Sequence, residues 1–246
     1  MTNEELLERM KDYCDYYKIP EEFLFDILED QKVVPMIRGK ATEYNVYLLL
    51  KHLLNPHEWV VSKLNLNAQN GMHDEDVTIT HQRTGIIVKV ECKNATRGSF
   101  RYSNRCRIKE PFCTIKLHKS RSDLAKANTT NDRYLKGDFD FVISNLSNAI
   151  IEGATYTERF LLKDDPDVAA AICEHYNCNY TFEEVFNATF DDYRFALADD
   201  LLMDDNSIPR TPPVLLHGGD CWHPISEFES YLADFIFKNR NKRGRR

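Results

Sequence analysis

Hydrophobic and polar residues alternate along two short segments of the first half of the chain. Val77 and Ile79 alternate with Asp76, Thr78 and Thr80 in the first segment. In the second, Ile86, Val88, Val90 and Cys92 alternate with Ile87, Lys89, Glu91 and Lys93. A period of two is typical of half-buried β-strands. The antiparallel register that matches these faces pairs Ile79 with Val88, Val77 with Val90, and Asp76 with Glu91. We therefore expect a hairpin with Asp76, Glu91 and Lys93 at one end of its polar face.

The rest of the pattern predicts helices and strands in alternation. Pro20, Asp165 with Pro166, and a Ser226–Glu229 capping box mark starts of helices. Apolar residues at positions 6, 7, 10, 23, 25 and 27 are expected to pack. Phe100 and Tyr102 lie among arginines, and packing is favoured over stacking on an unpaired base. The predicted helices are 3–17, 21–31, 40–54, 122–134, 165–175, 181–202 and one beginning near 226, and the other predicted strands are 57–66, 139–143 and 155–163.

Composition indicates a globular chain in a reducing compartment. Of its 246 residues, 42% are hydrophobic and 29% are charged, which is an ordinary balance. Seven cysteines form no C-x-x-C pair, and an odd number does not fit a complete disulfide framework. No apolar run approaches the ~20 residues that span a bilayer, and the acidic, amphipathic N-terminus is not a signal or transit peptide. We expect a cytoplasmic protein that does not enter a membrane.

The net charge of −7 hides an uneven distribution. Positions 93–136 hold 12 lysines and arginines against three acids, whereas positions 151–206 hold 14 acids against three bases. The last nine residues, KNRNKRGRR, contribute six bases and are expected to form a disordered tail. A basic stripe is what binding to nucleic-acid phosphates requires. The expected contacts with a phosphate backbone are Arg97, Arg101, Arg105, Arg107, Lys116 and Lys119.

The acidic end of the predicted hairpin has the composition of a magnesium site. Cross-strand partners have Cβ atoms roughly 4.5–5.5 Å apart, so Asp76 and Glu91 are placed to share one cation. Mg²⁺ takes oxygen ligands and keeps several waters, so two carboxylates suffice in the presence of phosphate. Lys93 emerges beside them on the same face.

This arrangement resembles the PD-(D/E)xK nuclease superfamily, which has the restriction-endonuclease-like fold. The resemblance is carried by Asp76-Val77-Thr78-Ile79 followed, 15 positions after Asp76, by Glu91-Cys92-Lys93. Glu43, on the helix preceding these strands, stands where the family often has a glutamate. Glu75 replaces the proline that usually precedes the aspartate, and Asp74 is a rival for the role of first metal ligand.

The resemblance implies roles for individual residues. Asp76, Glu91 and the backbone carbonyl of Cys92 would bind Mg²⁺. Lys93 would orient or deprotonate the attacking water, or stabilise charge on the phosphate. Glu43 would support the site or bind a second ion.

The expected architecture is α/β, with a restriction-endonuclease-like core whose central mixed sheet is flanked by helices. We assign 1–37 to a helical N-terminal extension, 38–146 to the nuclease core, 147–237 to a mostly helical C-terminal lobe for recognition or dimerisation that is integrated with the core, and 238–246 to the basic tail. By analogy at the level of the fold, the chain most resembles a type II restriction endonuclease. Such an enzyme cuts double-stranded DNA as a homodimer and is accompanied by a methyltransferase.

Three alternatives remain open. The first is a nucleic-acid-binding or regulatory protein of the same fold that does not cut. The second is a repair, junction-resolving or defence nuclease gated by a partner. The third concerns Cys173, His175 and Cys178 and the loop HGGDCWH at 217–223, which have the residue types of zinc sites. Their spacing is irregular, and a packed Trp222 is the preferred interpretation of that loop.

Overall fold

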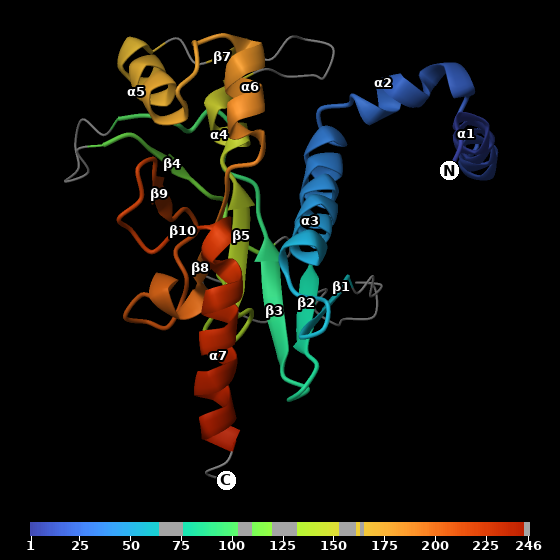
Figure 1. The fold of residues 1–246 in the computed structure, drawn as a ribbon. Helices are drawn as coiled ribbons and strands as arrows, with labels where there is room; N and C mark the ends of the chain where they lie inside the picture. Colours follow the sequence, from blue (N-terminus) through green and yellow to red (C-terminus); the bar gives the residue numbers. More distant parts are fainter. Residues whose placement is uncertain (64–75, 103–109, 120–131, 153–160, 163–164, 244–246) are drawn as a thin grey trace.

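A mixed β-sheet with helices on both faces forms the body of the protein (Figure 1). The computed structural model describes residues 1–63, 76–102, 110–119, 132–152, 161–162 and 165–243. The sheet has six strands in the order β1-β2-β3-β5-β8-β10, and β3 and β5 are parallel while the other neighbours are antiparallel. The strands are β1 (Trp59–Ser62), β2 (Val77–His81), β3 (Ile87–Cys92), β5 (Phe141–Asn145), β8 (Tyr193–Leu197) and β10 (His223–Pro224).

The hairpin register predicted from alternation is confirmed. Val77 pairs with Val90, and Ile79 pairs with Val88. Val77, Ile79, Val88, Val90 and Cys92 all belong to one apolar core, as the alternation requires. The polar residues between them therefore face the opposite side of the sheet.

Two apolar cores lie on opposite faces of the sheet. The first packs α3 (Val34–Leu53) and α7 (Phe228–Arg243) against β2, β3, β5 and β8. Figure 1 shows these two long helices lying across the same face. The second core contains Val142 and Ala196, together with Ala95, Phe100, Cys113, Ile115, Leu117 and residues of several short elements. These are α4 (Ser147–Ile150), α5 (Pro166–Tyr176), α6 (Phe182–Phe190), η3 (Ala198–Leu201) and a two-stranded sheet of β4 (Phe112–Thr114) and β9 (Pro213–Leu215).

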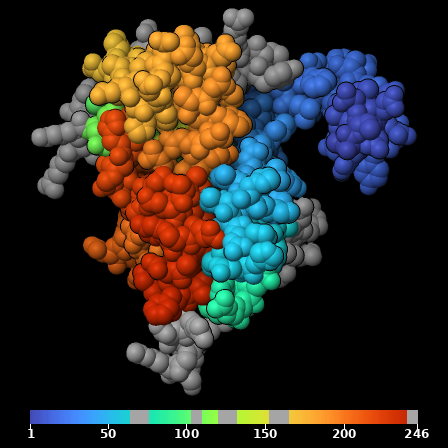
Figure 2. Space-filling view, in the orientation of Figure 1, coloured from blue at the N-terminus to red at the C-terminus, as the bar shows by residue number. Residues whose placement is uncertain are grey.

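The N-terminal helices project from the body as an arm, which we define as residues 1–31 (Figures 1 and 2). It contains α1 (Asn3–Tyr17), a 3-10 turn η1 (Glu21–Phe23) and α2 (Leu24–Leu28). Thr2 and Glu5 form a capping box at the start of α1. The expectation that the apolar residues of the arm are buried is wrong for Leu6, Leu7, Phe23, Phe25 and Ile27, which are 40–58% exposed. The prediction of a single helix over 21–31 is also wrong, because a 3-10 turn and a five-residue helix occupy this range.

Helix α3 starts earlier than predicted. It begins at Val34 rather than at residue 40 and carries a proline in its first turn, where the missing N–H costs nothing. The helix therefore crosses the expected boundary between residues 37 and 38.

The C-terminal half differs most from the prediction. Only residues 182–190 of the expected helix 181–202 are α-helical, because Tyr193–Leu197 forms the buried strand β8 between β5 and β10. Together, β8, β10 and α7 complete the central sheet and the layer that covers one of its faces. Residues 238–243 continue α7, which corrects the expectation of a disordered tail over that range.

Other predictions have mixed outcomes. Asp165 caps α5 by accepting from the N–H groups of Asp167 and Val168, as predicted. Ser226 lies inside a 3-10 turn, η4 (Ile225–Glu227), that leads directly into α7. Glu229 accepts from Asn55 N and Trp59 Nε1 at 3.0 and 3.1 Å, so it joins α7 to the start of β1 instead of completing the expected capping box. The short strands β6 (Ile151–Glu152) and β7 (Leu161–Leu162) pair with each other.

Some predictions concern residues outside the described ranges. These are Asp74, Arg105, Arg107, most of the helix 122–134 and most of the strand 155–163. No helix in the described part of the chain is both long and apolar enough to cross a membrane. The six described cysteines are free thiols.

Candidate functional site

The end of the β2–β3 hairpin brings Asp76 and Glu91 together. The register places them opposite each other, one step beyond the Val77–Val90 pair. Asp76 Oδ2 accepts a 2.8 Å hydrogen bond from Cys92 N, so the carboxylate continues the hydrogen bonding beyond β2. The alternation of faces turns Asp76 and Glu91 away from the α3–α7 core. This geometry fits the acidic pair expected from the sequence.

The pKa of the Asp76 carboxyl is raised to about 7. Burial is the largest cause, and the negative charge of Glu91 is the second. The hydrogen bond from Cys92 N and the positive charge of Lys93 act in the opposite direction. Burial and the neighbouring negative charge thus both disfavour the charged carboxylate of Asp76 in the metal-free protein.

Lys93 and Tyr134 both contact one oxygen of Glu91. Lys93 Nζ lies 2.7 Å from Oε1, and the Tyr134 hydroxyl donates a 2.6 Å hydrogen bond to the same atom. Burial alone would lower the pKa of Lys93, but the adjacent Glu91 carboxylate raises it, so the ammonium stays charged. Burial and the same carboxylate raise the pKa of Tyr134, which remains a hydrogen-bond donor. Among the described residues, neither Oδ1 of Asp76 nor Oε2 of Glu91 makes a hydrogen bond.

Glu43 occupies a separate position beside this acidic pair. It is buried in α3 and forms ion pairs with Lys40, at 2.9 Å, and with Lys63. Lys63 also approaches the backbone carbonyl of Asp76 at 3.5 Å, and the Glu43 charge raises the pKa of Asp76 further. The structure therefore brings Glu43 to the site but gives its carboxylate two lysine partners. Lys63 was not among the site residues predicted from the sequence.

Two arginines, Arg38 and Arg97, lie near each other where β3 leads into the following loop. Asn94 Nδ2 donates to the Arg38 carbonyl at 3.3 Å, and Thr42 Oγ1 donates to Asn94 Oδ1 at 2.6 Å, which holds this loop against α3. Burial lowers the pKa of Arg38, and the neighbouring Arg97 guanidinium lowers it further. Two guanidinium groups that repel each other in this way are suited to bind an anion. Arg97 was predicted as a phosphate contact, whereas Arg38 was missed because its segment was placed outside the helix.

The other predicted phosphate contacts are more dispersed. Arg101 is exposed and lies over the Phe112 ring, with 5.4 Å between its guanidinium carbon and the ring centroid. Lys116 is exposed as well. Lys119 forms a 2.8 Å ion pair with Asp138 and lies 5.7 Å from the centre of the Tyr134 ring, so it is held close to the Glu91 side of the sheet. Phe100 is fully buried in the second core, which confirms packing rather than base stacking for this residue.

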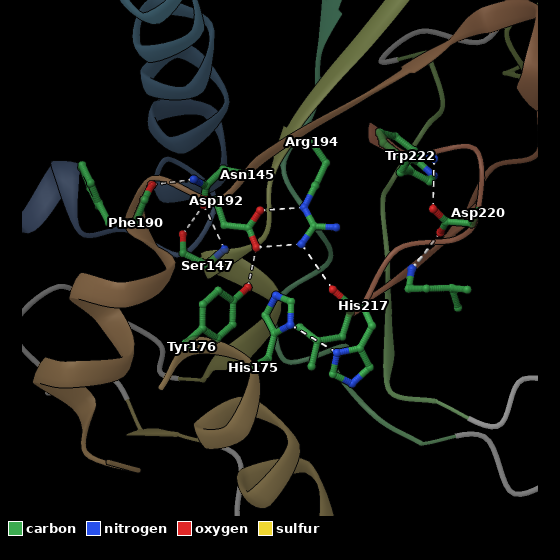
Figure 3. A network of polar contacts seen from close by, with 12 residues as sticks. Asn145, Ser147, His175, Tyr176, Phe190, Asp192, Arg194, His217, Asp220 and Trp222 are labelled. Carbon is green, nitrogen blue, oxygen red and sulfur yellow. Dashed lines mark hydrogen bonds and ion pairs between the residues drawn. The ribbon is translucent and has the colours of Figure 1, made fainter. Parts of the chain in front are cut away.

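Figure 3 shows a second polar network, in the part of the molecule where the sequence suggested zinc sites. His175 and His217 approach each other there, and a buried ion pair of Asp192 and Arg194 lies beside them. Trp222 is 2% exposed and packs in the second core, as preferred from the sequence. No group of three or more histidine, cysteine, aspartate or glutamate side chains converges in metal-binding geometry within the described residues.

Comparisons of the chain with protein-family models, with curated proteins and with solved structures found no match.

Proposed function

We propose that the chain is a Mg²⁺-dependent endonuclease that hydrolyses phosphodiester bonds in double-stranded DNA at the end of the β2–β3 hairpin. The observation that carries this proposal is the convergence of Asp76, Glu91 and Lys93 at one end of the sheet. The two adjacent carboxylates form an oxygen-rich donor set of the kind that Mg²⁺ prefers, and a charged amine lies beside them.

The donor atoms fit such an ion. Asp76 Oδ1 and Glu91 Oε2 are the carboxylate oxygens that would hold it, since the other two oxygens already accept hydrogen bonds. The backbone carbonyl of Cys92, which directly follows Glu91 in the sequence, is the third oxygen assigned. When bound, the ion would neutralise the phosphate and lower the pKa of a bound water.

The protein groups supply positioning and charge. Lys93, held by Glu91, would orient the attacking water or stabilise negative charge on the phosphate. Glu43 would support the site through Lys63, which contacts both Glu43 and the backbone of Asp76. The residues that would contact the phosphates on either side of the cut are Arg38, Arg97, Arg101, Lys116 and Lys119. Such contacts position the duplex without reading its sequence.

More specifically, we propose a type II restriction enzyme, and this step rests on the resemblance of the sequence to the PD-(D/E)xK nuclease superfamily. It would act as a homodimer, because two active sites must address two strands of a palindrome. A companion methyltransferase would protect the host DNA.

One observation favours a protein that binds DNA without cutting it. The 2.7 Å ion pair of Lys93 with Glu91 uses the amine that catalysis requires. Lys93 is only 24% exposed, so a purely structural pair is a coherent alternative.

Plasmid cleavage separates these functions. Wild type is compared with Glu91→Ala and Lys93→Ala in Mg²⁺ and in EDTA, and Lys89→Ala serves as a control on the same strand. Discrete fragments from wild type and Lys89→Ala, absent in EDTA and from the two other variants, would support the proposal. DNA that is retarded on a gel but not cut by wild type would favour the binding protein or a nuclease gated by a partner. Cleavage that survives both substitutions would place the active site elsewhere.

A further inference from the structure

Two histidines from distant parts of the sequence meet at the surface of the second core (Figure 3). His175 lies in the last turn of α5, and His217 follows β9. Their Nδ1 atoms are 3.2 Å apart, and the ring planes are inclined at 62°. The two zinc-like segments of the sequence are thus joined through one residue from each.

The residues adjacent to the two histidines contact the same ion pair. Tyr176, which follows His175, donates a 2.5 Å hydrogen bond to Asp192. Asp192 holds Arg194 at 2.7 Å, and Arg194 Nη2 donates to the Leu216 carbonyl, which immediately precedes His217, at 3.3 Å. Arg194 is 8% exposed, so this ion pair is a fixed internal support. Its two opposite charges also limit the repulsion that the guanidinium would exert on a nearby cation.

The loop that carries His217 is also stabilised by hydrogen bonds to Asp220, within the loop itself. Asp220 accepts hydrogen bonds from Leu215 N at 2.8 Å and from Trp222 N at 3.0 Å. Gly218 and Gly219 adopt φ angles of 81° and 87°, which favour glycine and allow the tight turn. The position of His217 is therefore fixed by contacts that do not involve its own ring.

We propose that His175 and His217 bind a transition-metal cation of the zinc class through their Nδ1 atoms, with water completing the coordination. Two nitrogens that each lie about 2.0–2.1 Å from a tetrahedral Zn²⁺ are about 3.3 Å apart, close to the separation in the structure. In the metal-free pair, one ring donates its Nδ1 proton to the other. On binding, that ring carries its proton on Nε2 instead, exchanged through solvent, so both Nδ1 lone pairs face the cation.

This site is independent of the proposed nuclease chemistry. It would join the end of α5 to the turn after β9, so the cation would stabilise the second core rather than act on a phosphodiester. Because no third histidine, cysteine or carboxylate of the described chain converges on the pair, we expect an open site that exchanges its cation, not a closed structural one.

Titration of the full chain with Zn²⁺ tests the proposal. Calorimetry compares His175→Gln and His217→Gln with His57→Gln as an exposed control. All carry serine at Cys173, Cys178 and Cys221 and glutamine at Glu91, which removes these thiols and disables the proposed Mg²⁺ site as competitors for the ion. We expect one Zn²⁺ per chain in the parent and in the control, and at least tenfold weaker binding in each of the other two variants. Equal affinity in all of them would overturn the proposal and leave the histidines as a simple hydrogen-bonded pair.

A second measurement avoids dependence on the folding of the variants. Nitrogen NMR of wild-type histidines follows the tautomers during the Zn²⁺ titration. The proposal requires both His175 and His217 to become Nε2-protonated and Nδ1-coordinated as one equivalent is added. Unchanged signals from these two rings at saturating Zn²⁺ would refute it.

Discussion

The Tyr134 hydroxyl donates a 2.6 Å hydrogen bond to Oε1 of Glu91, across 43 positions of sequence. The tyrosine ring also lies 5.7 Å from the ammonium nitrogens of both Lys93 and Lys119. Tyr134 thus holds Oε1 of Glu91 in place, and Oε2 of the same carboxylate is not used by this hydrogen bond. In the Mg²⁺ site that we propose, Tyr134 would orient the ligand Glu91, and loss of such an orienting group typically changes metal affinity or activity by roughly 10–100-fold.

Tyr134→Phe should therefore raise the Mg²⁺ concentration needed for cleavage and lower the rate by about tenfold or more. The free energy of unfolding should fall by about 1.5–3 kcal/mol, because the lost hydrogen bond is made to a charged carboxylate. The measurement is cleavage rate against Mg²⁺ concentration, with Tyr102→Phe as the control. An unchanged Mg²⁺ dependence would show that the tyrosine does not position Glu91.

Asp76→Asn should stabilise the metal-free protein at alkaline pH. The pKa of Asp76 is raised from its ordinary 3.8 to about 7, so the folded state holds a proton that the unfolded chain has already lost. This group therefore leaves stability unaffected below pH 3.8, reduces it progressively up to about pH 7, and gives a constant deficit above that value. Urea unfolding in EDTA at pH 5 and pH 8 should show the gap between variant and wild type widening toward pH 8, and a gap that narrows would contradict the assignment. Added Mg²⁺ should stabilise wild type but not the variant.

Lys63→Met should destabilise the fold by about 3–5 kcal/mol, because among the described residues it leaves the buried Glu43 with the exposed Lys40 as its remaining partner. The Lys63 side chain is 7% exposed, whereas that of Lys40 is 58% exposed. Lys40→Met should therefore cost less than about 1 kcal/mol. Denaturant unfolding of both variants provides the comparison. Equal losses of unfolding free energy in the two variants would mean that Lys63 is not the main partner of Glu43.

Arg38→Ala should weaken DNA binding at all sequences alike. Each phosphate contact that is lost reduces the slope of log K against log salt concentration by about one. Binding measured in Ca²⁺ over a salt series tests this, with Arg83→Ala, at the far end of the hairpin, as the control. A change confined to Arg83→Ala would point to a different DNA-binding face.

Deletion of the arm should leave the body folded. None of its residues belongs to either core, and several large apolar side chains on it are exposed. We expect the unfolding free energy of a chain that begins at residue 32 to stay within about 1 kcal/mol of wild type, because its core burial is unchanged. Exposed apolar surface of this kind is typical of protein interfaces, so the deletion should convert the proposed dimer to a monomer in light scattering. A deleted chain that remains dimeric would place the dimer contact on the body.

The alternation of apolar and polar residues predicted the β2–β3 hairpin correctly, because its faces and register depend on residues close together in the sequence. Alternation around Val77 and Val90 determines both the faces and the register of the hairpin, since a slip of one residue would expose its apolar side. The position of Tyr134 could not be predicted in this way, because its contact with Glu91 depends on how a distant segment returns to the sheet. Strand β8 was missed for a different reason. Tyr193–Ala196 is buried on both faces, so it lacks alternation and resembles the continuation of the preceding amphipathic helix.

The strands beside the acidic hairpin depend on segments that lie much later in the sequence, and this affects how the protein folds. Strand β5 must pair with β8, roughly 50 residues further on, and the core beneath β3 closes only when α7 docks near the C-terminus. Contacts between such distant segments form slowly, because the chain entropy of closing long loops is lost before they are made. We therefore expect the acidic hairpin to reach its final environment only after the C-terminal segment has docked, so a fragment containing only residues 38–146 should not fold by itself.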